Sequence, residues 1–163
     1  MSNETDIKLY RADKTEKSII RKMIELYLYD FSEYNLADIN EHGEYGYDRL
    51  DDYWTDNSRY PYIINYKGKK CGFAFVREIF EKDEMINNIA EYFIMRKYRK
   101  KGIGRYIAFK IFSMNKGKWQ INVLDCNKPA IIFWENIIKE HSKNDYRIIK
   151  NIDWDGPVFE FKV

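Results

Sequence analysis

A short basic segment with two glycines carries the clearest chemical signal in this sequence. Residues 99–104 read Arg-Lys-Lys-Gly-Ile-Gly, the pattern R-x-x-G-x-G, and they follow an apolar run. Glycines before a helix leave its first backbone N–H groups accessible to ligand oxygens, and the helix dipole favours an anion there. The neighbouring cations add charge for a polyanion. The segment therefore predicts a site for a phosphate or pyrophosphate group.

Two common nucleotide-binding motifs do not fit this segment. The dinucleotide pattern G-x-G-x-x-G needs a third glycine where the sequence has Ile107, and no G-x-x-x-x-G-K-[ST] run occurs in the chain. Two plainer interpretations stay open: an ordinary strand-to-helix turn, and a basic surface that binds nucleic acid. A surface of the second kind would not need glycines followed at once by a helix.

Hydrophobic periodicity predicts the elements that position the segment. Strands are expected near residues 7–12, 61–66, 71–80, 88–95, 119–123, 146–149 and 158–163. Helices are expected over 14–29, near 33–39, from 102 to a stop at Gly117, and after Asn127, which suits an N-cap. The "KGKK" turn predicts a hairpin. This order favours an α/β fold: a mixed central sheet of six to seven strands flanked by about four helices.

Length and composition indicate one globular domain. The chain has 163 residues, enough to bury a substantial core, so we expect a single domain over 1–163. Hydrophobic residues make up 45% and charged residues 33%, which is typical of folded proteins that do not span membranes. No apolar run reaches the roughly 20 residues of a membrane span, and the polar N-terminus is unlike a secretory signal. We expect a cytoplasmic protein.

Cysteine and histidine usage predicts no metal. Cys71 and Cys126 form no C-x-x-C pair, so we expect two reduced, half-buried thiols. His42 and His141 have no ligand-like spacing with either cysteine. Cys126 lacks a nearby histidine to activate it, so we interpret it as a structural thiol rather than a nucleophile.

Two motifs together resemble a known family. "YRKKGIG" at 98–104 is similar to the central motif of the GNAT-type N-acetyltransferases, in which a strand, [QR]-x-x-G-x-[GA] and a helix hold the pyrophosphate of acetyl-CoA. "NKPAIIFW" at 127–134 resembles the family pattern N-x-x-A-x-x-F-[YW], and the element order fits over nearly the whole chain. The resemblance implies a GNAT-like fold and acetyl-CoA as co-substrate.

The resemblance also implies a set of cofactor-binding residues. The strand before the motif would splay from its neighbour, and its backbone would hold the pantetheine arm and polarise the thioester carbonyl. Asn127 would contact the cofactor, serve only as the helix cap, or do both. The predicted cofactor-binding residues are Phe93, Ile94, Met95, Arg99, Lys100, Lys101, Gly102, Ile103, Gly104, Arg105 and Asn127.

In this family a neutral amine attacks the thioester directly. Glu91 is our candidate general base because it lies three residues before Ile94 on the same strand, close to the expected thioester. Since a free alkylamine has a pKa of ~10, we expect the carboxylate to remove the ammonium proton through a water molecule. The plain alternative is a glutamate that points to solvent. Trp134 stands where many relatives carry tyrosine, and an indole N–H is no acid at neutral pH. Another group or water then protonates the thiolate, or it leaves unassisted.

The acceptor is expected to bind the segment after the first helix. Residues 29–60 are rich in tyrosine, tryptophan and carboxylates, among them Asp51 and Asp52, which suits a small cationic amine through ion pairs and cation–π contacts. The alternative is a solvated acidic loop. We expect a small-molecule amine rather than a protein as partner, and neither nucleic acid nor membrane. A homodimer is frequent in the family, but no feature demands one.

Two other functions stay open from the sequence. A nucleic-acid-binding module would use the basic run, and its binding would weaken steeply with salt. A catalytically silent acyl-CoA-binding protein would bind the coenzyme without turnover, which the absence of tyrosine at Trp134 allows.

Overall fold

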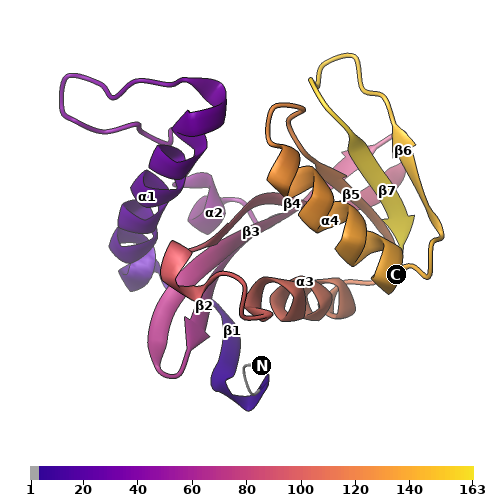
Figure 1. The fold of residues 1–163 in the computed structure, drawn as a ribbon, viewed down its shortest axis with the longest axis horizontal. Coiled ribbons are helices and arrows are strands. Elements are labelled where there is room, and N and C mark those ends of the chain that lie inside the picture. Colours follow the sequence, from indigo (N-terminus) through magenta and orange to yellow (C-terminus); the bar gives the residue numbers. More distant parts are fainter. Residues whose placement is uncertain (1–3) are drawn as a thin grey trace. The chain divides into compact units, whose positions relative to one another are not determined.

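The computed structural model describes residues 4–163. Within them the chain forms seven strands and four α-helices, with the strands in the order β1-β2-β3-β4-β5-β7-β6 (Figure 1). Strands β4 and β5 are parallel, whereas β1–β2, β5–β7 and β6–β7 are antiparallel. The predicted α/β fold, a mixed sheet of six to seven strands flanked by about four helices, is confirmed. None of the helices in this range is both long and apolar enough to cross a membrane.

The residues fall into two compact units, which divide β3 and β4 between them. Unit 1 comprises the described residues up to Phe75 and Glu91–Ile103, and unit 2 comprises Val76–Ala90 and Gly104–Val163. The single domain expected over 1–163 stays a prediction.

Unit 1 begins with a strand and a long amphipathic helix. Its elements are β1 (Ile7–Arg11), α1 (Lys17–Asn35), α2 (Asp52–Thr55), β2 (Arg59–Tyr66), the start of β3 (Lys69–Glu81) and the end of β4 (Glu84–Ile94). A capping box of Asp13 and Glu16 precedes α1, which buries Ile20, Met23 and Ile24. The helix ends at Leu36, whose φ of 55° is left-handed.

The second helix expected near 33–39 is wrong. Helix α1 continues to Asn35, beyond its predicted end at Tyr29, and residues 36–40 are not helical. The short helix of this region lies instead at Asp52–Thr55. Strand β2 and strand β3 turn through Lys67 and Gly68, both with positive φ, as the predicted hairpin requires.

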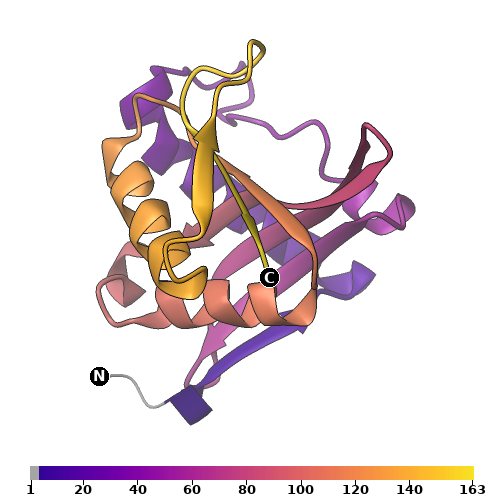
Figure 2. The ribbon, with the colours of Figure 1, turned by 90° about the vertical axis from the view of Figure 1, so that its right-hand side faces the viewer.

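Unit 2 packs two helices against the C-terminal strands. Its remaining elements are α3 (Ile103–Met114), β5 (Lys118–Asn122), α4 (Lys128–His141), β6 (Tyr146–Ile149) and β7 (Val158–Lys162), which can be followed in Figure 2. The ring of Phe112 on α3 lies 5.0 Å from Trp119, 6.4 Å from Trp134 and 5.0 Å from Phe161, centroid to centroid. Helix α3 ends at Met114, three residues before the predicted stop at Gly117.

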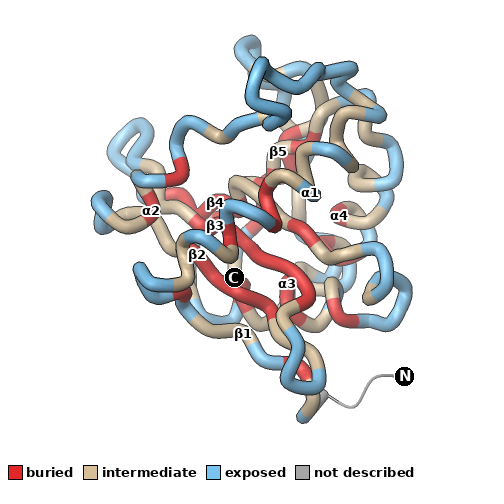
Figure 3. The backbone as a smooth tube through the Cα atoms, turned by 90° about the vertical axis from the view of Figure 1, so that its left-hand side faces the viewer, coloured by how far each residue is buried: buried red, intermediate tan, exposed pale blue. Residues whose placement is uncertain are grey.

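Buried positions concentrate on the strands and on α3, and exposed positions on the loops (Figure 3). Strand β4 begins at Glu84, four residues earlier than expected, and Asn87 and Asn88 within it are buried. Their amides are satisfied because Asn87 donates to the carbonyl oxygens of residues 116 and 118 and Asn88 to that of Gln120.

Candidate functional site

The basic segment forms a bent, exposed turn that leads into α3. Strand β4 ends at Ile94, a 3-10 turn spans Arg96–Tyr98, and α3 begins at Ile103. Lys100 has a φ of 58° and Gly102 a φ of 79°, so the backbone bends sharply before the helix. Lys100, Lys101 and Gly102 are exposed, whereas Ile103 is buried. The predicted strand, basic turn and helix are confirmed as structural elements.

Two arginines of this turn are bound to α1. Asp30 accepts from the Nε of Arg96 at 2.8 Å with its Oδ1 and forms an ion pair with Arg99 through its Oδ2. The Nε of Arg99 also donates to the carbonyl oxygen of Ile94 at 2.7 Å. Arg99 thus ties the turn to both the preceding strand and the first helix.

The lysines of the turn gather around one aromatic ring. The Nζ atoms of Lys97 and Lys101 lie 5.5 and 5.8 Å from the ring centroid of Tyr98, and Tyr98 in turn lies edge-on to Tyr66 at 6.2 Å. Cation–π contact of this kind holds an exposed ammonium near the surface without neutralising it. Positive charge is thereby concentrated next to Gly102.

The remaining predicted cofactor residues lie in unit 2. Gly104 and Arg105 belong to the first turn of α3, and Arg105 pairs with Glu140 of α4, its Nε lying 2.8 Å from that carboxylate, and stacks over Phe109 at 4.6 Å. Asn127 caps α4, because its Oδ1 accepts the Ala130 N–H at 3.2 Å. The predicted capping role of Asn127 is confirmed; its contact with a cofactor stays a prediction.

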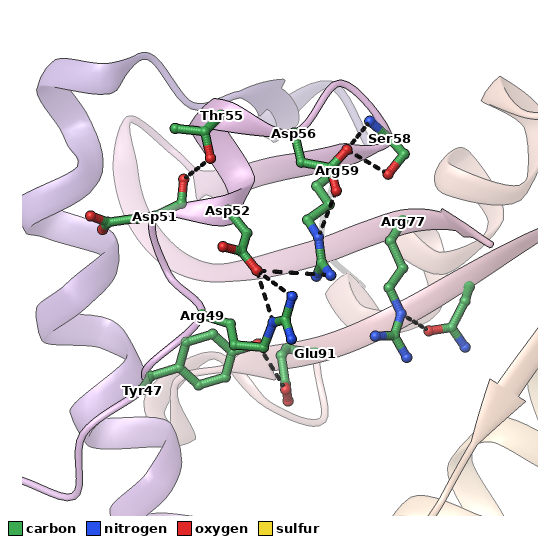
Figure 4. A network of polar contacts seen from close by, with 11 residues as sticks. Tyr47, Arg49, Asp51, Asp52, Thr55, Asp56, Ser58, Arg59, Arg77 and Glu91 are labelled. Atoms are coloured by element: carbon green, nitrogen blue, oxygen red, sulfur yellow. Dashed lines mark hydrogen bonds and ion pairs between the residues drawn. The ribbon is translucent and has the colours of Figure 1, made fainter.

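Glu91, the candidate base, lies among tyrosines rather than pointing freely to solvent. Its Oε2 accepts a hydrogen bond from the hydroxyl of Tyr27 at 2.7 Å. Its Oε1 accepts one from the hydroxyl of Tyr47 at 3.2 Å, which Figure 4 shows. Tyr27 comes from α1 and Tyr47 from the loop between α1 and α2. Burial, followed by the nearby carboxylate of Glu91, raises the pKa of both phenols, so both stay protonated donors.

Aromatic rings surround the Glu91 carboxylate and its two phenol donors. The ring centroid of Tyr27 lies 5.9 Å from Phe31, 5.9 Å from Phe73 and 5.8 Å from Phe93, and the ring of Tyr47 lies 6.0 Å from Phe75. Sequence reasoning missed both tyrosines, since they stand 64 and 44 residues from Glu91. The aromatic enrichment of residues 29–60 was the one available signal for Tyr47.

Several acids expected to meet the acceptor are paired inside unit 1. Asp51 forms an ion pair with Lys17. Asp52 accepts a hydrogen bond from the Nε of Arg49 at 2.8 Å and lies 3.9 Å from Arg59, as Figure 4 shows. Because protein cations already neutralise these two carboxylates, they are less suited to an incoming ammonium than the sequence indicated.

The two thiols differ from each other. Cys71 is fully buried and Cys126 is exposed, so the expected half-buried state is wrong for both, although both are free. Burial raises the pKa of the Cys71 thiol to about 11. Trp134 is buried on α4, with its ring 5.1 Å from Phe133. Among residues 4–163, no group of three or more histidine, cysteine or acidic side chains is placed to hold a metal ion.

Comparisons with known proteins identify a family model and similar folds. The model of the acetyltransferase (GNAT) family matches residues 21–137. An acetyltransferase from Thermus thermophilus has a TM-score of 0.69 at 14% identity, over 96% of this chain and 97% of that one. The spermidine N-acetyltransferase of Vibrio cholerae, in complex with CoA and spermine, has a TM-score of 0.64 at 12% identity, over 98% and 95%.

A third similar structure is an aminoglycoside acetyltransferase from an uncultured soil metagenomic sample, in complex with sisomicin. Its TM-score is 0.61 at 12% identity, over 82% of this chain and 88% of that one. At these identities the likeness concerns the fold. No curated protein sequence matches the chain.

Proposed function

The chain belongs to the acetyltransferase (GNAT) family, and we propose that it moves an acetyl group from acetyl-CoA to the primary amine of a small cationic acceptor. Transfer is direct, within a ternary complex. The observation that carries the proposal is the Glu91 carboxylate, held by two phenols among aromatic rings, on the strand that leads into the basic turn.

The basic turn fits the pyrophosphate of the co-substrate. Exposed Lys100 and Lys101 supply charge, Gly102 leaves the approach open, and the first N–H groups of α3 at Ile103 and Gly104 donate. Backbone groups of the strand end take the pantetheine arm. The full proposed set is Phe93, Ile94, Met95, Arg99, Lys100, Lys101, Gly102, Ile103, Gly104, Arg105 and Asn127, in which Arg99 and Arg105 already contact Asp30 and Glu140.

Glu91 acts as the general base through a water molecule. The water gives a proton to Glu91 and takes one from the acceptor's ammonium, which leaves a neutral amine. The amine nitrogen forms a bond to the thioester carbonyl carbon, and the C–S bond then breaks to release the thiolate. The surplus proton on the nitrogen passes to water or to the thiolate, which leaves a neutral amide. A thiol pKa of about 8.5 makes the thiolate a tolerable leaving group, so buried Trp134 need not act as an acid.

The surroundings of Glu91 favour an ammonium-bearing acceptor. A carboxylate bordered by the faces and edges of tyrosine and phenylalanine rings attracts a cation by both charge and ring quadrupole. The similar structures from Vibrio cholerae and the soil sample were solved with spermine and with sisomicin. Polyamines and amino sugars are therefore the first acceptors to screen.

The test begins with calorimetric titration of acetyl-CoA into the wild type, Gly102→Glu and Gly68→Glu. The control Gly68 has a φ of 76° and open space, so its variant carries the same backbone strain outside the R-x-x-G-x-G segment. We expect binding to be lost only in Gly102→Glu. Absence of binding by the wild type, or salt-sensitive binding of nucleic acid that CoA does not displace, would overturn the proposal.

An amine screen with the wild type and Glu91→Gln follows. We expect turnover on a polyamine or amino sugar, and a fall in kcat of about 10²–10⁴-fold in Glu91→Gln, the usual contribution of a positioned base. Tight coenzyme binding without turnover on any amine would instead identify a silent acyl-CoA-binding protein.

A further inference from the structure

Each carboxylate oxygen of Glu91 accepts a hydrogen bond from a tyrosine hydroxyl, and the two tyrosines belong to different elements. Tyr27 of α1 donates to Oε2 at 2.7 Å, and Tyr47 of the loop before α2 donates to Oε1 at 3.2 Å. A donor on each oxygen constrains the plane of the carboxylate. Such bonds also favour the ionised carboxylate over the protonated one.

The two donor hydroxyls, of Tyr27 and Tyr47, differ in the kind of element that positions them. Tyr27 is fixed by its place in α1 and by its contacts with Phe31, Phe73 and Phe93. Tyr47 sits in an irregular segment whose anchor is Glu25, which accepts the backbone N–H of Tyr45 at 2.8 Å and of Gly46 at 3.0 Å. The Tyr47 hydroxyl is therefore the donor whose position depends on how this loop is docked.

Neutral phenols face the Glu91 carboxylate, and the guanidinium of Arg99 lies over the ring of Phe93 at 5.6 Å. Tyr27 and Tyr47 themselves face Glu91 from α1 and the loop, and Tyr53 of α2 interacts with Tyr47 from the far side. The ring of Tyr53 stacks on Phe75 with 3.9 Å between centroids, and the guanidinium carbon of Arg59 lies over the Tyr53 ring, 5.5 Å from its centroid. The phenol hydroxyls of Tyr27 and Tyr47 are thus two donors that stabilise the charged form of the carboxylate.

We infer that Tyr47 and Tyr27 are positioning residues that set the orientation and the proton affinity of Glu91, with Tyr47 coupling the loop before α2 to the carboxylate. The catalytic consequence rests on the proposed role of Glu91 as base. Loss of either hydroxyl leaves Glu91 with one donor fewer, so the carboxylate binds its proton more tightly and takes a less defined orientation.

The direct test is a pH titration of the Glu91 carboxyl carbon by NMR, with ¹³C-labelled glutamate and assignment through Glu91→Gln. We expect the midpoint to rise by about one pH unit in Tyr47→Phe and by more in Tyr27→Phe, whose bond is shorter. Both changes remove only a hydroxyl, so the rings keep their packing. An unmoved midpoint in both folded variants overturns the inference.

Two matched controls separate this effect from loop loosening and from phenol loss in general. Tyr45→Phe removes a hydroxyl of the same loop, which lies 3.3 Å from the Oγ of Ser32, and should shift the Glu91 midpoint much less than Tyr47→Phe does. Tyr10→Phe removes a phenol that donates to another carboxylate, Glu16, at 3.1 Å. A midpoint shift of equal size in Tyr45→Phe would contradict a specific role for Tyr47.

The pH profile of kcat distinguishes this inference from the proposed function. If Glu91 is the base, its acid limb moves to higher pH in Tyr47→Phe in step with the NMR midpoint, while Tyr10→Phe leaves the profile unchanged. A shifted midpoint with an unmoved kcat profile supports positioning by the tyrosines and overturns the role of Glu91 as base.

Discussion

The Nε of Arg99 lies 2.7 Å from the carbonyl oxygen of Ile94, so the first cation of the R-x-x-G-x-G turn is bound to the strand that precedes it. The same guanidinium is paired with Asp30 of α1, which also accepts from Arg96 at 2.8 Å. One carboxylate therefore partly neutralises two cations of the turn before any anion binds.

Asp30→Asn is expected to strengthen acetyl-CoA binding at low ionic strength. Removing the carboxylate leaves two guanidiniums uncompensated, and the gain from exposed charge interactions of this kind amounts to about 0.2–1 kcal/mol in total, or roughly a 1.4- to fivefold lower Kd. The gain should vanish at high salt. Calorimetric titrations across a salt series measure it, with Asp6→Asn, which breaks the remote pair with Lys67, as control. Equal salt slopes for both variants would contradict the prediction.

The sequence predicted most elements because their apolar patterns are strong and local. Strand β5 follows directly from alternation, and the Asn127 cap follows from a capping residue before an apolar stripe. The start of β4 was hidden because Asn87 and Asn88 look like a turn in the sequence, yet each finds backbone carbonyl partners across the sheet. Helix α1 was predicted too short because its last turns carry Asp30, Ser32 and Asn35, which are weak helix formers.

The parts of the site formed by neighbouring residues in the sequence could be predicted, whereas the contacts between distant residues could not. The residues of the basic turn are contiguous in the sequence, so the strand before it, its glycine and the helix after it could all be predicted from local patterns. Contacts between distant residues could not, because no local period places Tyr27 beside Glu91 or Asp30 beside Arg99. For the same reason Asp51 and Asp52 looked available for a substrate, although Lys17 and Arg49 pair with them.

Gly72→Ala is expected to be strongly destabilising. A Cβ at Gly72 would lie 2.1 Å from the carbonyl oxygen of Phe93, so β3 and the end of β4 could not keep their present spacing. Overpacking of this kind costs about 1–3 kcal/mol or more. Urea unfolding of the variant measures the loss. Gly68→Ala meets no atom within 4 Å and should cost only the roughly 1 kcal/mol of its positive φ; equal losses in the two variants would argue against the close approach.

The thiols should react in two separate classes. Cys126 is exposed and should be modified quickly by an aromatic disulfide reagent at pH 8. Cys71 is buried and its pKa is raised to about 11, so it should react only when the protein unfolds. Counting released thiolate in native and denatured protein, with Cys126→Ser as control, measures both. Fast modification of two thiols in the native protein would contradict the burial of Cys71.

The ion-paired glutamate of the C-terminal strands should make stability depend on acid. Glu160 on β7 is buried and lies with Lys118 and Arg147 beside a cavity of about 360 Å³. Burial opposes its ionisation, but hydrogen bonds from Gln120, Arg147 and Lys118 outweigh it, so the pKa of the carboxyl lies below its ordinary value. The stabilisation is therefore complete above the unfolded-state pKa of about 4.3 and is lost as the pH falls through the folded-state pKa.

Glu160→Gln is expected to lower the free energy of unfolding at pH 7 by about 1–3 kcal/mol, since the cationic donors around this buried side chain lose their charged acceptor. The loss should shrink as the pH falls below about 4.3, because the unfolded wild type then binds a proton that the folded carboxylate takes up only at lower pH. Glu84→Gln is the matched control: Glu84 contacts the same Lys118 at 2.9 Å but is half exposed, so its variant should lose under about 1 kcal/mol. Urea unfolding of the three proteins at pH 7 and pH 3.5 decides the matter, and a pH-independent difference between wild type and Glu160→Gln would show that the amide fails for reasons of packing rather than charge.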